Sequence, residues 1–123
     1  AVQIGVSAWT AEALKQTLSA SIFSRSTECH NQDKVSMGTI AARDASRVIV
    51  LTEQVIAALC CASVQAIHLK GLDGKLAEVL AAFKTWVLQT FDYVVEDRPL
   101  QHELQQLVDR LENLELLSSE LVR

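Results

Sequence analysis

The chain has 123 residues, of which 50% are hydrophobic, with one proline and four glycines. This length suits a single domain with a sizeable core, and the scarcity of helix-breaking residues favours an ordered, all-α protein over a disordered one. The formal net charge is -4 and the sequence has no basic patch, which argues against nucleic acid and anionic membranes as partners. We therefore expect one helical domain over residues 1–123, built from long antiparallel helices that form part of a bundle.

The first predicted helix covers residues 2–18, because its apolar residues recur at helical spacing while its polar residues gather on the other side. A polar, turn-prone stretch follows at residues 24–34, which is typical of a solvated surface loop. The next predicted helix runs from about Val35 to His68, with the Asp33 carboxylate as its N-cap. Arg43 and Arg47 lie one turn apart on it, where they would pair with acids across a bundle or form part of a solvated or ion-paired face.

Residues 48–69 are apolar on nearly every side of this helix. Such a helix must be buried on every side, and a chain this short cannot easily wrap it. Glu53 and Gln54 interrupt the apolar run, so we do not expect the helix to cross a membrane. The excess apolar surface predicts a partner chain or a further part of this one.

The remaining helices are predicted from glycine and proline signals and from leucine spacing. Gly71 and Gly74 flank Asp73, which indicates a helix stop followed by a cap, and the string GLDGK lacks the spacing of a phosphate loop. An amphipathic stripe then runs from Leu76 to Val94, and Pro99 follows Asp97 as the first residue of a last helix. A heptad-like seam is expected to pack against a helical partner. It consists of Leu100, Leu104, Leu107, Leu111, Leu114 and Leu121. The solvated face opposite is mostly acidic and consists of Glu103, Asp109, Glu112, Glu115 and Glu120.

The three cysteines are Cys29, Cys60 and Cys61, an odd number with no C-x-x-C spacing. The adjacent pair lies in the apolar helix, where buried thiols behave as small hydrophobes, so a reduced, cytoplasmic setting is expected. The first residues lack the features of a signal peptide and resemble the middle of a helix, so we expect the native chain to begin upstream.

No complete active site follows from the residues alone. His30, His68 and His102 are too far apart for a helical ligand pair, and no metal site is expected. Neighbouring side chains such as Cys29 and His30 point apart in an extended backbone, which disfavours a nucleophile pair. A serine nucleophile has no elbow motif in its support.

The polar loop and the start of the long helix nevertheless resemble the aromatic amino acid ammonia-lyase family, which includes phenylalanine, tyrosine and histidine ammonia-lyases and related aminomutases. The matching residues are Asn31, Gln32, Asp33, Val35, Ser36, Met37, Gly38, Ala41, Ala42 and Arg43. Residues 3–16 resemble the family helix before this loop, and residues 97–100 resemble the turn before a late helix. The resemblance implies that the chain is the C-terminal portion of such an enzyme.

The resemblance also implies a chemistry. The family builds a 4-methylideneimidazole-5-one (MIO) group from an internal Ala-Ser-Gly and uses it to expel ammonia from an aromatic L-amino acid. This chain has no Ala-Ser-Gly and lacks the family's upstream tyrosine base, because Tyr93 lies in the wrong segment, so we expect it to be inactive by itself. Glu28 and Gln32 match catalytic positions near the substrate amine and the prosthetic group, and Asn31 matches a binding position. Histidine-type members more often have Glu in place of Gln32, which favours phenylalanine or tyrosine as substrate.

The family forms homotetramers whose long central helices share a bundle, which agrees with the partner expected from residues 48–69. Two other interpretations remain open: a stand-alone helical oligomerisation or interaction module, and part of an aromatic amino acid aminomutase. Nothing in this segment separates a lyase from a mutase. Residues 19–34 are expected to be poorly ordered without the partners that complete the active site.

Overall fold

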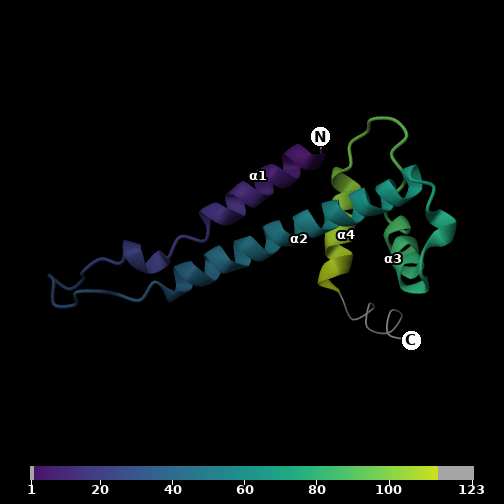
Figure 1. The fold of residues 1–123 in the computed structure, drawn as a ribbon. Coiled ribbons are helices and arrows are strands. Elements are labelled where there is room, and N and C mark those ends of the chain that lie inside the picture. Colours follow the sequence, from purple (N-terminus) through teal and green to yellow (C-terminus); the bar gives the residue numbers. More distant parts are fainter. Residues whose placement is uncertain (1, 114–123) are drawn as a thin grey trace. The chain divides into compact units, whose positions relative to one another are not determined.

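The computed structural model describes residues 2–113, and every regular element in that range is a helix (Figure 1). The expected all-α class is thus confirmed. The elements in chain order are α1 (Val2–Lys15), η1 (Ala20–Phe23), α2 (Gly38–Leu69), η2 (Asp73–Lys75), α3 (Glu78–Leu88) and α4 (Gln101–Glu112), where η denotes a 3₁₀ helix. Leu114, Glu115, Glu120 and Leu121, which extend the predicted leucine seam and acidic face, lie outside the described residues.

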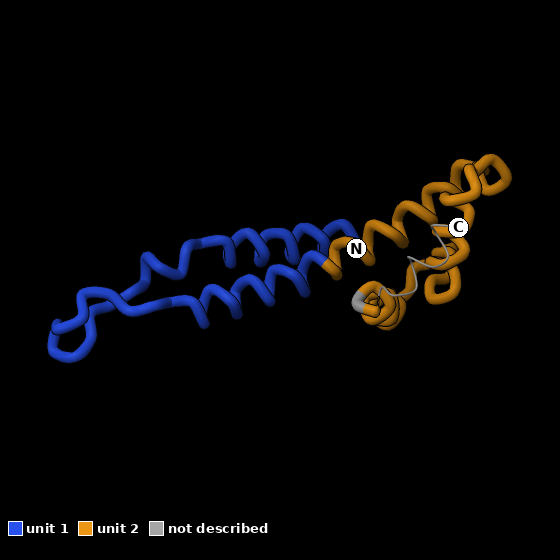
Figure 2. Tube along the Cα trace, turned by 90° about the horizontal axis from the view of Figure 1, so that it is seen from below, with its two compact units in different colours: residues 1–52 blue, residues 53–123 orange. Residues whose placement is uncertain are grey.

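The chain divides into two compact units, residues 1–52 and residues 53–123, which Figure 2 shows in two colours. Helix α2 contributes its first half to unit 1 and its second half to unit 2. In unit 1, α1 and the first half of α2 lie side by side and run antiparallel, joined at one end by the polar loop (Figures 1 and 2). Each unit is described separately below.

A polar link joins the two helices of unit 1. Arg47 donates from Nε and Nη2 to Glu12 Oε1, over 2.8 and 2.7 Å. Both side chains remain more than 40% exposed, so Arg47 lies on an ion-paired, solvated helix face of its own chain, one of the two arrangements expected. Such exposed pairs contribute little, about 0–1 kcal/mol. No residue of α1 is buried, and Leu14 is 65% exposed.

Helix α2 begins at Gly38, three residues later than the sequence predicts. The predicted start at Val35 is wrong because the Ser24 hydroxyl binds both backbone groups of Val35, accepting from its N–H at 2.9 Å and donating to its carbonyl at 2.8 Å. Val35 is therefore held outside the helix, and Asp33 is not its cap. The Ser36 hydroxyl instead accepts from the Gly38 N–H at 3.3 Å.

The C-terminus of α2 confirms the predicted stop. Gly71 has φ +62, a left-handed conformation that glycine adopts without steric cost. Its N–H donates to the His68 carbonyl, and the next N–H, of Leu72, donates to the Ile67 carbonyl. This pair of bonds is a Schellman motif, which satisfies carbonyls that the helix end leaves free.

Unit 2 contains the hydrophobic core. Its buried members come from α2, α3, α4 and the segment after α3, namely Ala57, Cys60, Cys61, Val64, Val87, Phe91, Leu107 and Val108. Leu107 is fully buried, and Leu100, Leu104 and Leu111 pack against the cluster, so the described part of the leucine seam faces the core. Glu103 is not on a solvated face as predicted, because its side chain is only 15% exposed and accepts from Arg98 at 2.6 Å.

Helix α3 is shorter than the stripe from Leu76 to Val94 predicts, since it ends at Leu88. Two side chains from other helices bind the backbone near this end and in the segment that follows it. Arg110 donates to the Trp86 carbonyl at 2.8 Å, and Gln65 binds both backbone groups of Val94. The stripe residues beyond the helix still pack inward, because the extended segment places Phe91 in the core with 2% exposure. Helix α4 also starts late, at Gln101, and the predicted Asp97 cap is not used.

Helix α2 retains large exposed apolar side chains along its length, among them Ile49, Ile56 and Leu59 at 58, 42 and 64% exposure. By length and composition alone α2 is apolar enough to cross a membrane, a test that a core helix also passes, and a third of its most apolar window is buried. The requirement for a covering partner stays a prediction.

Candidate functional site

The polar loop of unit 1 ends in a compact turn at residues 27–32, here called the tip loop. It lies between η1 and α2, at the end of unit 1 where the two helices are joined (Figure 1). Thr27 and Gln32 form an isolated antiparallel bridge, in which each N–H donates to the other's carbonyl at 3.0 and 3.3 Å. The bridge brings residues five apart in sequence to opposite sides of one turn.

The residues inside the bridge have a rare backbone conformation. Glu28, Cys29 and His30 have φ values of 54, 53 and 67, all in the left-handed region. This conformation costs about 1–2 kcal/mol for each residue other than glycine, so it persists only where neighbouring contacts hold it. The Asn31 N–H donates to the Glu28 carbonyl at 3.0 Å, and Ser26 Oγ lies 2.6 Å from His30 Nδ1.

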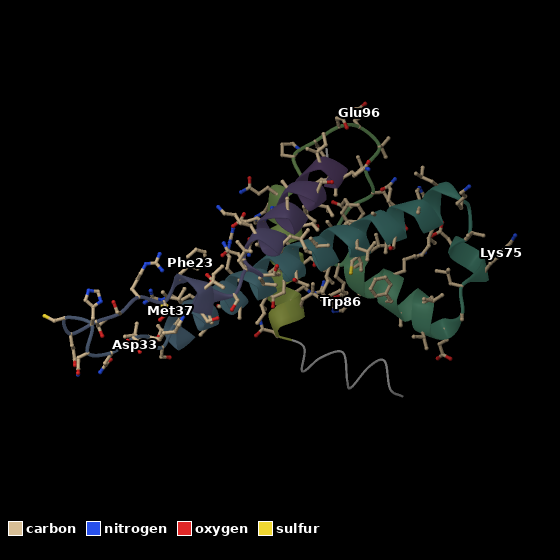
Figure 3. The ribbon with its side chains drawn as sticks, turned by 60° about the vertical axis from the view of Figure 1, so that its left-hand side comes forward. Phe23, Asp33, Met37, Lys75, Trp86 and Glu96 are labelled. Carbon is tan, nitrogen blue, oxygen red and sulfur yellow. The ribbon has the colours of Figure 1, made fainter. Side chains whose placement is uncertain are left out.

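The base of the loop is closed by the hydrogen bonds between Ser24 and Val35 described above. These bonds join the two sides of the loop at positions eleven residues apart in sequence. Figure 3 shows the side chains of this region, with Phe23, Asp33 and Met37 labelled around the loop. Two sets of hydrogen bonds therefore hold the loop, one at its base and one at the tip bridge. The turn has a defined shape even though its residues are exposed.

All three predicted site residues, Glu28, Asn31 and Gln32, lie in the tip loop and are exposed. Gln32 Oε1 accepts a hydrogen bond from Thr27 Oγ1 at 3.3 Å. Within residues 2–113, the Glu28 and Asn31 side chains make no hydrogen bond to the rest of the chain. The turn thus presents one carboxylate and two amides, a set that can accept a proton from an amine and can donate to and accept from a polar ligand.

The sequence interpretation missed the groups that shape this turn. Ser24 and Thr27 counted only as members of the polar stretch at residues 24–34, and nothing in their types revealed that each binds a residue across the loop. Five-residue separation of a threonine and a glutamine is too common to predict a bridge. Among residues 2–113, no group of three or more His, Cys, Asp and Glu side chains is arranged to hold a metal ion.

Unit 2 contains a second polar cluster, which links the end of α2 to α3. Asp73 accepts from Lys84 Nζ at 2.6 Å and lies 3.4 Å from His68 Nδ1, while the His68 ring stacks on Tyr93 with centroids 3.9 Å apart. The hydrogen bond from Lys84 lowers the pKa of Asp73, and the same bond raises the pKa of Lys84. The cluster fastens the turn at residues 70–75 to α3, a structural role.

Comparison with known proteins identifies the family of the chain. The family model for aromatic amino acid lyases matches residues 1–87. The chain belongs to the aromatic amino acid lyase family. The match covers all of unit 1 with the tip loop, the whole of α2, and α3 as far as Val87, so the resemblance predicted from the loop is confirmed.

Similar relatives of this lyase-family chain include two curated enzymes. It is 36% identical over 118 residues to a tyrosine ammonia-lyase of Cereibacter sphaeroides, covering 89% of this chain and 21% of that protein. It is 31% identical over 98 residues to a histidine ammonia-lyase of Bacillus subtilis, covering 80% of this chain and 19% of that protein. The chain therefore spans about a fifth of the length of the curated relatives it matches.

A solved structure resembles the fold of this lyase-family chain as well. The crystal structure of a tyrosine aminomutase mutant matches with a TM-score of 0.79 and 29% identity, covering 93% of this chain and 23% of that one. The fold of this lyase-family chain thus resembles that of a solved relative. The relatives include histidine and tyrosine ammonia-lyases and an aminomutase, so their names do not single out one substrate or one reaction.

Proposed function

We propose that this chain contributes its tip loop to an active site that eliminates ammonia, without oxidation, from an aromatic L-amino acid. The observation that carries the proposal is the tip loop itself. In a chain of the aromatic amino acid lyase family, the turn gathers Glu28, Asn31 and Gln32 in six residues and leaves all three exposed. A turn that is strained at three consecutive residues and carries free polar side chains is suited to meeting a ligand.

In this proposal Glu28 and Gln32 are the catalytic residues, and Asn31 helps to bind the substrate and the prosthetic group. The Glu28 carboxylate holds the substrate ammonium group, accepts one of its protons to free the amine, and returns that proton to the nitrogen as the C–N bond breaks and ammonia leaves. The Asn31 and Gln32 amides donate to and accept from neutral or anionic polar groups without changing charge. The substrate carboxylate would need a cation from elsewhere in the active site, since the tip loop contains no lysine or arginine.

The family implies an MIO group, and the tip loop fits such a group. The set of one carboxylate and two amides suits a neutral, polar heterocycle beside an ammonium group, and Glu28, Asn31 and Gln32 would border it. When bound, the MIO group supplies an electrophile that makes the amine a leaving group. Its Ala-Ser-Gly source does not occur in these 123 residues, so another segment must supply it.

The active site is therefore completed by other chain segments, and the 123 residues act as a C-terminal helical domain of a longer lyase and are inactive alone. The partner is most simply further copies of the same chain in a cytoplasmic homotetramer whose α2 helices share a bundle. The exposed Ile49, Ile56 and Leu59 support this. So does an open groove of about 490 Å³ in unit 1, which is bordered by residues 16–20 and by Ala41, Asp44, Ala45, Val48 and Ile49.

Phenylalanine or tyrosine is the proposed substrate, with histidine less favoured because Gln rather than Glu stands at position 32. A second candidate is an aminomutase, which would return the amine to the β-carbon. The structural match to a tyrosine aminomutase favours including it.

The test uses the polypeptide in which this chain is joined to the segment that supplies Ala-Ser-Gly. Each of L-phenylalanine, L-tyrosine and L-histidine is supplied, and the unsaturated acid is followed by ultraviolet absorbance and the β-amino acid by chromatography. Glu28→Gln should lower the rate about 10²- to 10⁴-fold, whereas Glu78→Gln, at an exposed position on α3, should not. Full activity of the Glu28→Gln enzyme, or activity of the 123 residues alone, would contradict the proposal.

A further inference from the structure

The hydrogen bonds of the tip loop connect Thr27 to Gln32, one of the residues proposed to contact the ligand. Thr27 and Gln32 are joined three times, by the two backbone bonds of the bridge and by the side-chain bond from Thr27 Oγ1 to Gln32 Oε1. The backbone bonds fix where the Cα of Gln32 lies. The side-chain bond is the one hydrogen bond that the Gln32 amide group makes among residues 2–113, and it sets the direction of that amide.

That direction determines what the amide offers to a ligand. A primary amide has one oxygen acceptor and two N–H donors. The Thr27 hydroxyl occupies the oxygen, so both donors on Nε2 remain available. Threonine suits this task because its β-branched side chain is stiff at χ1, which limits where the hydroxyl can point.

We propose that Thr27 is a positioning residue that holds the Gln32 amide with its N–H groups toward the ligand. Gln32 then recognises an acceptor oxygen, the carbonyl of a prosthetic group or the carboxylate of an amino acid. This inference rests on the proposed function for the identity of the ligand, but the orientation of the amide belongs to the chain itself. The orientation can therefore be tested without activity.

The neighbouring hydroxyl provides a matched control. Ser26 lies next to Thr27 in the same loop, but its Oγ binds His30 Nδ1 and does not reach Gln32. Thr27→Val removes the hydroxyl and keeps the branched shape, Thr27→Ser keeps the hydroxyl, and Ser26→Ala removes a hydroxyl that serves another residue. Gln3, an exposed glutamine on α1, is the reference for an unrestrained side chain.

The first measurement is nitrogen-15 NMR relaxation of the glutamine side-chain amides in the 123-residue chain. In the wild type the order parameter of the Gln32 amide should lie well above that of Gln3, and Thr27→Val should lower it to below about 0.6, the range of flexible groups. Thr27→Ser and Ser26→Ala should leave it unchanged. A soluble paramagnetic chelate should broaden the Gln32 NH₂ protons in the wild type, because these protons face solvent.

The inference would be overturned by a Gln32 amide as mobile as that of Gln3 in the wild type, by equal effects of Thr27→Val and Ser26→Ala, or by NH₂ protons shielded from the chelate. A loss of restraint in Thr27→Ser equal to that in Thr27→Val would also overturn it, because the hydroxyl would then not be the cause.

The second measurement uses the complete lyase. Thr27→Val should lower kcat about fivefold with a smaller change in KM, as expected for one neutral hydrogen bond, and Thr27→Ser should restore it. An unchanged kcat in Thr27→Val would show that the orientation does not serve catalysis. Absence of ammonia release by the wild type would instead refute the proposed function, and the NMR result would still decide the orientation.

Discussion

The Gln65 side chain provides hydrogen-bond partners for the backbone of the segment that follows α3. Its Oε1 accepts from the Val94 N–H at 2.9 Å, and its Nε2 donates to the Val94 carbonyl at 3.3 Å. Both hydrogen bonds are part-buried, so a Val94 backbone group that lost its Gln65 partner would not gain full access to water. The same segment places Phe91 in the core. Replacing Gln65 by leucine removes both hydrogen bonds while preserving the approximate volume of the side chain.

The expected cost can be worked from these two bonds. Each contributes about 0.5–1.5 kcal/mol net, so Gln65→Leu should lower the free energy of unfolding of unit 2 by about 1–3 kcal/mol. In a domain of this size each kcal/mol shifts Tm by about 4–8 °C. Fluorescence of Trp86, which packs against the core, reports the unfolding when Trp9 has been replaced by phenylalanine.

Gln65→Glu provides the matched control. Its carboxylate still accepts from the Val94 N–H, but its second oxygen faces the Val94 carbonyl and repels it. The folded state then disfavours the ionised form, so the pKa of the new carboxyl in the folded state rises above its usual value of about 4.3. The defect should be present at neutral pH and should shrink as the pH falls through that raised pKa. A Gln65→Leu chain as stable as the wild type would refute the stabilising role of the two Gln65–Val94 hydrogen bonds.

Two further predictions concern unit 2. Arg110 donates to the Trp86 carbonyl and lies 4.5 Å over the Trp86 ring, so Arg110→Lys, which loses the planar fork, should cost about 1 kcal/mol in urea unfolding and alter Trp86 fluorescence; identical curves would contradict this. Because the pKa of Asp73 is lowered, its pairing with Lys84 stabilises the fold above the unfolded carboxyl pKa, and this contribution is lost as the pH falls through the folded value. Since the pKa of Lys84 is raised, the contribution is also lost as the pH rises through that value. Tm measured against pH should therefore separate wild type from Asp73→Asn at neutral pH and converge in acid; a gap that persists in acid would exclude the ion pair as its cause.

Helix existence was predictable because it depends on local patterns. The apolar periodicity of residues 2–18 predicts a helix that the structure places at Val2–Lys15, three residues shorter, and the glycine at position 71 ends α2 as predicted. The start of α2 and the end of α3, by contrast, are contacted by side chains from distant segments. Ser24 delays the start of α2, and Gln65 and Arg110 act at the end of α3. No local pattern around residues 35 or 88 carries that information.

The candidate site divides in the same way. Glu28, Asn31 and Gln32 were selected by resemblance to a family, and the structure brings them together on one turn. The left-handed backbone of Glu28, Cys29 and His30 could not be predicted, because none of them is glycine and the conformation is held by the bridge around them. Sequence reasoning selected the side chains that are proposed to meet a ligand but missed those that hold the turn around them.

The central claim, that the tip loop borders the ligand, can be tested through a thiol already in place. Cys29 is an exposed thiol between Glu28 and Asn31, whereas Cys60 and Cys61 are buried, and burial raises the pKa of Cys61 to about 12. Iodoacetamide should therefore alkylate Cys29 selectively. In the complete lyase, the unsaturated acid product should slow this alkylation in proportion to the fraction of sites it occupies. A Cys29 alkylation rate that saturating product leaves unchanged would contradict the claim.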